Sequence, residues 1–270
     1  MHVRAKKSLG QNFLRDSSFV ERIVNALDPG DTDIVFEIGP GQGALTAQLI
    51  KRAGRLIAIE FDRDMIAILA ERFRSAGNFE LIKADALNVD FSSLLGVGTK
   101  KAKLVANLPY NISTPILQRL IDQREIFSEI VLMFQREVVE RITAPAGGKE
   151  RGFLSVLVEN AFEADYLFDV PPGAFQPVPK VWSGVVRLIP KPATTKDYPL
   201  FKKIVSASFA QKRKTMLNNL RQAVEDAQGL LAKAEIDARR RAETLTLDEW
   251  WKLTRTIARS RSVRDDRDTI

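Results

Sequence analysis

Cysteine is absent from this chain of 270 residues, and histidine occurs only once, as His2. Without cysteine the protein has no disulfides, no thiolate metal ligands and no cysteine nucleophile. The single histidine disfavours histidine-based catalysis and histidine-rich metal sites, so we expect no metal. These absences leave few kinds of enzyme, and methyl transfer that depends on positioning the reactants is one of them.

Long apolar runs are also missing, since none approaches the ~20 residues needed to span a bilayer. Hydrophobic residues make up 45% and charged residues 28% of the chain, as in soluble globular proteins. The basic first residues are not followed by an apolar segment, so we expect no signal peptide and a cytoplasmic location. The length suits one large domain, or a large and a small one.

The charge is unevenly balanced, with a formal net value of +7 and a pI near 9.6. Basic residues occur in clusters at positions 6–7, 100–103, 202–203, 212–214 and 239–241. One such cluster is most often a solvated surface. Several in one chain favour a polyanionic partner such as a nucleic acid.

Short apolar segments alternate with helical patterns from residue 33 onward. The predicted strands are residues 33–39, 55–60, 79–85, 104–107 and 129–134, and the predicted helices are 44–53, 63–74, 113–123 and 137–142. Nearly continuous apolar strands separated by amphipathic helices are typical of a parallel sheet covered on both faces. The sequence therefore predicts a doubly wound, Rossmann-like α/β fold.

The alternation changes after residue 145. A helix at 153–162 and strands at 166–170 and 181–189 are predicted, and we expect the two strands to extend the sheet antiparallel. Composition shifts at 190–195, and the pattern beyond it is helical and charged. We predict a large domain at residues 1–190, a small α-helical domain at 191–258 and a disordered tail at 259–270.

The tetrapeptide Asn107-Leu108-Pro109-Tyr110 follows the fourth predicted strand. The Asn107 side-chain oxygen and the Leu108 carbonyl can both accept hydrogen bonds from an exocyclic amino group. Pro109 restricts the backbone so that this carbonyl can be aimed, and Tyr110 offers a face for an extruded base. On these four letters alone, an ordinary strand-end turn is the simpler interpretation.

Three other predicted strand ends carry residues suited to a ligand, and ligands of such sheets bind at the carboxyl ends of the strands. A glycine loop at 39–43 lets the backbone approach a ligand, and the following helix N-terminus attracts a carboxylate. Glu60 can accept bonds from both hydroxyls of a ribose. Asp85 is placed to meet an adenine amino group.

A glycine loop with an acid after the second strand also describes dinucleotide sites. Here, however, the spacing is Gly39-x-Gly41-x-Gly43 rather than Gly-x-Gly-x-x-Gly, and Glu37 lies two residues before the first glycine. This arrangement suits the amino-acid end of S-adenosylmethionine, where an ammonium and a carboxylate must both be held. The loop therefore favours a methyltransferase over a dehydrogenase, and the Asn107 strand end strengthens this preference.

Taken in order, these segments resemble the ribosomal RNA adenine dimethyltransferases of the KsgA (RsmA) type. The resemblance covers roughly residues 5–257, and Phe61 stands where an aliphatic residue is expected. Each segment is modest alone but specific as an ordered set. The matching segments are 8–14, 37–43, 60–62, 84–87, 107–110, 134–138, 175–183 and 211–215.

The resemblance implies S-adenosylmethionine as cofactor, bound by domain 1–190, and RNA binding by domain 191–258. It implies cofactor contacts from Gln11, Asn12, Leu14, Gly39, Gly41, Glu60, Asp85 and Asn107. It further implies a base site at Asn107, Leu108, Pro109, Tyr110 and Phe175, and phosphate contacts from Lys212, Arg213 and Lys214. Without the resemblance, Asn12 and Leu14 fit an ordinary helix entry, Phe175 a core aromatic and the basic run a solvated helix.

The implied product is N6,N6-dimethyladenosine at two adjacent adenines in a 3′-terminal hairpin loop of 16S rRNA. The implied partner is the 30S subunit or its precursor, met by a monomer in ribosome biogenesis without metal or membrane. The related 23S rRNA methylases of the antibiotic-resistance type share the catalytic domain, but the 211–215 element with Asn218-Asn219-Leu220 favours 16S rRNA. A non-catalytic assembly factor would not need the intact loop and strand ends, and a DNA adenine methyltransferase would show a sequence-reading domain.

Overall fold

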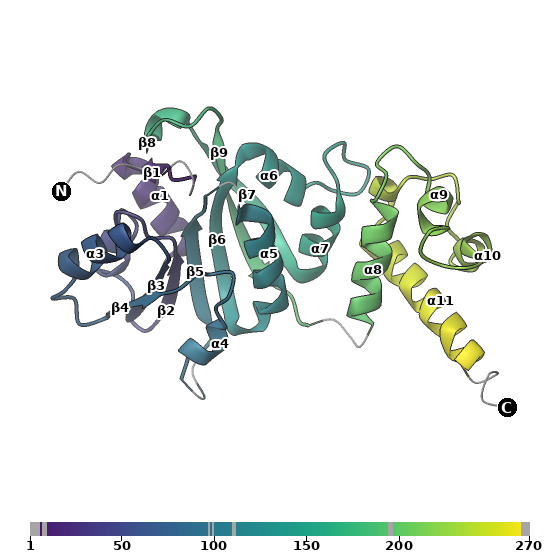
Figure 1. Ribbon diagram of the computed structural model, residues 1–270, viewed down its shortest axis with the longest axis horizontal. Coiled ribbons are helices and arrows are strands. Elements are labelled where there is room, and N and C mark those ends of the chain that lie inside the picture. The colour runs from purple at the N-terminus through teal and green to yellow at the C-terminus, as the bar shows by residue number, and fades with distance from the viewer. Residues whose placement is uncertain are drawn as a thin grey trace. The chain divides into compact units, whose positions relative to one another are not determined.

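The computed structural model describes residues 6, 10–96, 98, 100–109, 112–193 and 197–265. The chain divides into two compact units, traced in Figure 1. The first unit contains the residues up to 139 together with 162–191, and the second contains 140–161 together with the residues from 192 onward. In the part of the chain that is described, no helix is long and apolar enough to cross a membrane.

A seven-stranded sheet forms the centre of the first unit, in the order β4-β3-β2-β5-β6-β9-β7. Its strands are β2 (Ile34–Ile38), β3 (Arg55–Glu60), β4 (Phe79–Lys83), β5 (Ala102–Asn107), β6 (Phe127–Gln135), β7 (Phe162–Val170) and β9 (Ser183–Pro190). Strands β4, β3, β2, β5 and β6 are parallel, whereas β9 runs antiparallel to both β6 and β7. The predicted doubly wound sheet with an antiparallel addition is confirmed.

The two faces of the sheet are buried by different helices, because side chains alternate along each strand. On one face Val35 and Val105 belong to a core cluster that also contains the buried residues of α1 (Ser17–Leu27). On the other face Phe36 meets Phe91 of α4 (Phe91–Leu94) edge-on, with ring centroids 5.4 Å apart. Burying each such Phe stabilises the fold by roughly 1.5–3 kcal/mol.

The remaining helices of the first unit connect these strands. They are α2 (Thr46–Leu49), α3 (Arg63–Arg72), α5 (Ser113–Asp122) and the short 3-10 helices η3 (Arg124–Ile126) and η4 (Pro172–Ala174), and α6 (Arg136–Ile142) begins in this unit. The predicted helix at 44–53 is α-helical only over the four residues of α2. Turns continue it, and the last of them ends where the Ala53 N–H donates to the Leu49 carbonyl at 2.8 Å.

A second, two-stranded sheet joins segments that lie far apart in the sequence. Strand β1 (Phe13–Leu14) pairs antiparallel with β8 (Phe175–Gln176), so that Leu14 lies opposite Phe175. Local patterns do not predict this pairing, because each strand is only two residues long. It brings the N-terminal segment onto the proline-rich stretch before β9.

The second unit is helical, with a core around Trp250, which is fully buried, and Phe201, which stacks on Trp251 with ring centroids 4.4 Å apart. The buried Arg151 guanidinium donates to the Ala144 and Leu245 carbonyls and to Glu159. The elements of this unit are the end of α6 with α7 (Phe153–Ala161), α8 (Tyr198–Ser208), α9 (Met216–Leu220), α10 (Ala227–Lys233), η5 (Ala242–Thr244) and α11 (Leu247–Asp265).

The units and helices of the structure differ from the predicted domain limits in two places. The boundary near residue 190 agrees with the structure, but residues 140–161 belong to the second unit rather than the first. Periodicity shows that α7 is helical and cannot show that it packs against α8 and α11. Helix α11 also continues to Asp265, within the segment predicted as a disordered tail.

Candidate active site

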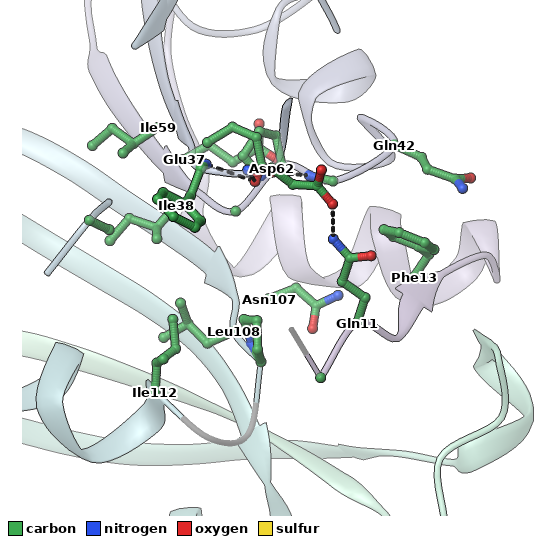
Figure 2. Close-up of a pocket in the computed structure, with 18 of the residues that line it drawn as sticks. Gln11, Phe13, Glu37, Ile38, Gln42, Ile59, Asp62, Asn107, Leu108 and Ile112 are labelled. Atoms are coloured by element: carbon green, nitrogen blue, oxygen red, sulfur yellow. Dashed lines mark hydrogen bonds between the residues drawn. The ribbon is translucent and has the colours of Figure 1, made fainter. Parts of the chain in front are cut away.

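A cavity of about 260 Å³ lies at the carboxyl ends of the parallel strands (Figure 2). Its walls come from the ends of β2, β3, β4 and β5 and from the segment around β1, with Phe175 of β8 beside them. The cavity brings together most of the residues predicted to form the site: Gln11, Asn12, Leu14, Gly39, Gly41, Glu60, Asp85, Asn107, Leu108, Pro109 and Phe175. Tyr110 lies outside the described residues.

The glycine loop after β2 depends on left-handed backbone. Gly39, Gly41 and Gly43 have φ values of +65°, +56° and +79°. A Cβ at Gly43 would also lie 2.7 Å from the Phe73 ring, too close without a shift. The loop closes on itself through a 2.8 Å hydrogen bond from the Gly43 N–H to the Pro40 carbonyl. Glycine is therefore required at position 43 both for the backbone conformation and for the close approach of the Phe73 ring.

Glu37 lines the cavity but is 1% exposed. Its Oε2 accepts a 2.6 Å hydrogen bond from the hydroxyl of Thr46, which is the first residue of α2. Burial raises the pKa of Glu37 to about 8, and the negative charge of the nearby Glu60 raises it further. The hydrogen bonds from Thr46 act in the opposite direction and lower it. A cationic group brought into the cavity would favour its charged form.

Replacing Glu37 by Gln should make stability less dependent on pH. The folded-state pKa of Glu37, about 8, lies above its unfolded value of 4.5. Protonated Glu37 therefore contributes fully to the free energy of unfolding below pH 4.5, and this contribution is lost as pH rises through 8. Urea unfolding at pH values from 5 to 8 should show that the free energy of unfolding of the parent falls by on the order of a few kcal/mol more than that of Glu37→Gln. Equal slopes in parent and variant would contradict this account.

Glu60 ends β3 and holds the loops on either side of it. Its Oε2 accepts from the Gly41 N–H at 3.1 Å, and its Oε1 accepts from the N–H groups of Phe61 and Asp62, each at 2.9 Å. Burial raises the pKa of Glu60 despite these three hydrogen bonds. The carboxylate thus ties the glycine loop to the end of β3 while it lines the cavity.

Asp62 anchors the N-terminal segment to this edge of the sheet. Its Oδ2 accepts from Gln11 Nε2 at 2.7 Å, shown as a dashed line in Figure 2, and its Oδ1 accepts from Lys6 Nζ at 2.5 Å. Asp62 also caps α3 by accepting from the Asp64 N–H. Burial opposes its ionisation, but the bonds from Lys6 and Gln11 prevail and hold the pKa of Asp62 below its usual value.

Asp62 is a site residue that the sequence reasoning missed. It is the N-cap of α3, a role that a short polar residue before a helix commonly has. Its contact with Gln11, 51 residues earlier, has no local sequence signal.

Asn107 ends β5 with its amide orientation set by the N-terminal segment. Its Nδ2 donates to the Asn12 backbone carbonyl at 3.4 Å, so the side-chain oxygen is available to accept. The following Leu108 is 2% exposed, and its N–H donates to the Met133 carbonyl of β6. Phe175 is 3% exposed and belongs to the core cluster as well as to the cavity wall.

Asp85, beyond the end of β4, completes the wall. Its Oδ1 accepts from the Leu87 N–H at 3.0 Å and its Oδ2 from Asn88 Nδ2 at 3.3 Å. The predicted phosphate contacts Lys212, Arg213 and Lys214 do not line this cavity; they are exposed residues of the second unit.

The charges of the cavity fit S-adenosylmethionine, whose ammonium and sulfonium groups are cationic. Four carboxyl groups line it, from Glu37, Glu60, Asp62 and Asp85. Of these, only Asp62 is paired with a cation, Lys6, in the contacts described above, and no lysine or arginine occurs among the described lining residues. A dinucleotide, with its anionic pyrophosphate, would be disfavoured by this set. Because Gly39 and Gly41 line the cavity without side chains, the backbone of the loop can approach a ligand closely. Among the described residues, no group of three or more His, Cys, Asp or Glu side chains could hold a metal ion.

Comparison with known proteins gives consistent matches over nearly the whole chain. Residues 2–259 match the model of a family described as ribosomal RNA adenine dimethylase. The chain is 45% identical over 260 residues to ribosomal RNA small subunit methyltransferase A of Nitrosococcus oceani, covering 93% of this chain and 96% of that one. It is 43% identical over 264 residues to the protein of that name from Geobacter sulfurreducens, covering 94% and 96%.

Solved structures show the same architecture. A dimethyladenosine transferase from Plasmodium falciparum superposes with a TM-score of 0.76 at 27% identity, covering 89% of this chain and 95% of that one. The 23S rRNA methyltransferase ErmE gives a TM-score of 0.69 at 23% identity, covering 91% and 99%, which shows a shared fold alone.

Proposed function

The chain belongs to the ribosomal RNA adenine dimethylases, which use S-adenosylmethionine, and from this premise we propose its substrate. It methylates N6 of two adjacent adenines in a 3′-terminal hairpin loop of 16S rRNA, within the 30S particle or its precursor. The relatives named as small subunit methyltransferases support the choice of this RNA over 23S rRNA. The protein acts as a monomer in the cytoplasm, where these particles assemble, and has a role in their biogenesis.

One observation carries the proposal. Asn107 ends β5, and Leu108 follows it in the same cavity as the glycine loop and Glu60, so a base held by them faces a bound cofactor. The bond from Asn107 Nδ2 to the Asn12 carbonyl leaves the Asn107 oxygen to accept from an adenine amino group. Bound S-adenosylmethionine supplies an electrophilic methyl group, and this chain's residues position the nitrogen that receives it.

The chemistry expected of these residues follows from the electronic structure of adenine. The N6 lone pair is delocalised into the ring, so the amine is a poor nucleophile. Asn107 Oδ1 and the Leu108 carbonyl accept its two hydrogens, which favours a more tetrahedral nitrogen with its lone pair directed to the cofactor side. Catalysis then rests on positioning and fixed dipoles. The methylated nitrogen is positively charged and acidic, so it releases its proton to solvent without a general base.

We assign the cofactor's parts to the carboxyl groups of the cavity by charge and by strand position. Glu37 and the glycine loop hold its amino-acid end, Glu60 holds the ribose hydroxyls, and Asp85 holds the adenine amino group. Phe175, in the cavity wall, stacks on the target base. Gln11, Asn12 and Leu14 cover the cofactor, with the bond from Gln11 to Asp62 closing this cover.

The second unit presents a basic turn, defined as residues 211–215, for RNA. Its Lys212, Arg213 and Lys214 are exposed. The buried Asn219 fixes the turn from below by donating to the carbonyls of Ser208 and Gln211, at 2.6 and 3.2 Å. A rigid loop that carries three cations is suited to contact phosphates.

Replacing Lys212, Arg213 and Lys214 together by Ala should weaken RNA binding in a salt-dependent way. The slope of log affinity against log salt concentration should become shallower by roughly 2 to 3, because each lost phosphate contact removes about 0.7–0.9. Filter binding to 30S particles at several salt concentrations measures this slope. The exposed Lys51, Lys100 and Lys101, before β3 and β5, give a matched triple Ala control. Equal slopes for the two triple variants would contradict the assignment.

Methyl transfer from labelled S-adenosylmethionine to unmethylated 30S particles tests the function, with 50S particles and duplex DNA in parallel. Nucleoside mass spectrometry identifies the product. Dimethyladenosine confined to 16S rRNA is the expected result. Label in 23S rRNA would assign the protein to the resistance-type enzymes. Cofactor binding without transfer to any substrate would instead indicate a non-catalytic assembly factor.

A further inference from the structure

The connection between β8 and β9 exposes three large apolar side chains. Val178 is 66% exposed, Val181 42% and Trp182 47%. The other two tryptophans differ, since Trp250 is fully buried and Trp251 donates its indole N–H to Asn160. Neighbouring apolar groups left in solvent indicate a binding surface.

These side chains lie at the same edge of the sheet as the base site. Asn107 of β5 is opposite Met133 of β6, and Met133 is opposite Val185 of β9. Trp182 precedes Val185 by three residues, and its carbonyl accepts from the Arg136 N–H at 3.0 Å. Strand spacing and rise therefore place the Trp182 and Asn107 backbones roughly 14 Å apart. The connection also continues directly from Phe175 in the cavity wall.

Basic residues lie within this connection and next to both of its ends. Lys180 lies within the connection and is exposed. Arg15 is exposed on the β1 side, where its N–H donates to the Ala174 carbonyl at 2.8 Å. The half-exposed Arg136 guanidinium lies 3.7 Å from Asp169, whose carboxylate also accepts from the Tyr166 hydroxyl. Aromatic and apolar groups among cations are the features by which proteins hold single-stranded nucleic acid.

We propose that Trp182, with Val178 and Val181, forms a stacking platform for an unpaired nucleotide next to the target adenine. Lys180, Arg15 and Arg136 contact the phosphates on either side of it. The inference rests on the proposed function, because it requires an RNA substrate. When the target adenine turns into the cavity, the base next to it loses a stacking partner. Stacking on the Trp182 ring replaces that interaction.

Kinetics with 30S particles provide the first test. Trp182→Ala should raise the KM for particles about tenfold, the loss expected for one base–aromatic contact. Both kcat and the Kd for S-adenosylmethionine should remain within about twofold of the parent, because Trp182 touches neither the cofactor nor the target base. Trp182→Phe keeps a ring and should recover most of the loss. A parental KM for Trp182→Ala, or equal losses in both variants, would overturn the platform.

Photocrosslinking provides a test that does not depend on turnover. Benzoylphenylalanine at position 182 should crosslink to 16S rRNA within a few nucleotides of the target adenines when particles are irradiated. An adduct with a ribosomal protein only, or no adduct, would overturn the proposal. The parent, assayed on the same particles, separates the two hypotheses. Failure of the parent to methylate them refutes the proposed function, whereas a methylating parent with an unaffected Trp182→Ala refutes only the platform.

Discussion

Replacing Asn107 by Ala should lower the rate of methyl transfer by roughly a hundred- to a thousandfold, the range seen when one fixed hydrogen-bonding group of an active site is lost. The variant lacks the side-chain oxygen that would accept from N6, so the amine keeps its planar, weakly nucleophilic form. The Kd for S-adenosylmethionine should change much less, because the glycine loop and the carboxyl groups of Glu37 and Glu60 remain. Single-turnover kinetics with saturating 30S particles, with cofactor binding by calorimetry, separate the two effects.

Two further variants sharpen this test. Asn107→Asp keeps oxygen acceptors but cannot donate to the Asn12 carbonyl, which now accepts from Nδ2. It should therefore also be slow, because its side chain loses the bond that orients it. Asn25→Ala is the control, since Asn25 is exposed on α1 and its side-chain oxygen accepts a 2.6 Å hydrogen bond from Arg52. A parental single-turnover rate for Asn107→Ala would refute the role of Asn107.

Replacing Glu60 by Gln should weaken S-adenosylmethionine binding by roughly ten- to a hundredfold, since leaving one buried polar group unpaired costs about 1–3 kcal/mol. The Glu60 carboxylate accepts from the N–H groups of Gly41, Phe61 and Asp62. A Gln amide offers one oxygen and turns its NH2 group toward another N–H donor. The glycine loop should then detach from the end of β3, and the rate at saturating cofactor should fall less than the affinity.

Glu80→Gln is the matched control for this change. Glu80 lies on the neighbouring strand β4, and its side chain is 44% exposed and paired with Arg55. Because exposed pairs contribute little, cofactor affinity should stay within about twofold of the parent. If Glu60→Gln binds the cofactor as tightly as Glu80→Gln, the carboxylate neither supports the loop nor contacts the ligand.

Features with a local physical cause were predictable from the sequence. The apolar run of β2 and the glycines at 39, 41 and 43 determine a buried strand and a left-handed turn within a few residues. Because parallel strands end at one edge of the sheet, Glu60, Asp85 and Asn107 could be placed together before their contacts were seen.

Features that depend on distant partners were not predictable in this way. The pairing of Leu14 with Phe175 and the bond from Gln11 to Asp62 join residues with no shared local pattern. The apolar sequence of α7 predicts a buried helix. It does not predict which element buries it, because a helix packed against α8 and one packed against the sheet have the same pattern of apolar residues. The long-range contacts therefore required the structure, whereas the strand ends did not.

The second unit is built from two separate stretches of the chain, and this limits how it can be truncated or exchanged between related proteins. A chain ended at residue 191 would keep α7 but lose α8 and α11, against which it packs. Val156, Leu157 and Val158 of α7 are buried in the full protein, and the part of the helix surface that α8 and α11 cover would then face water. Removing the C-terminal helices should thus destabilise the remaining fragment, because these helices are not an independent domain. Recombination between family members that exchanges the C-terminal helices must therefore carry residues 140–161 together with them.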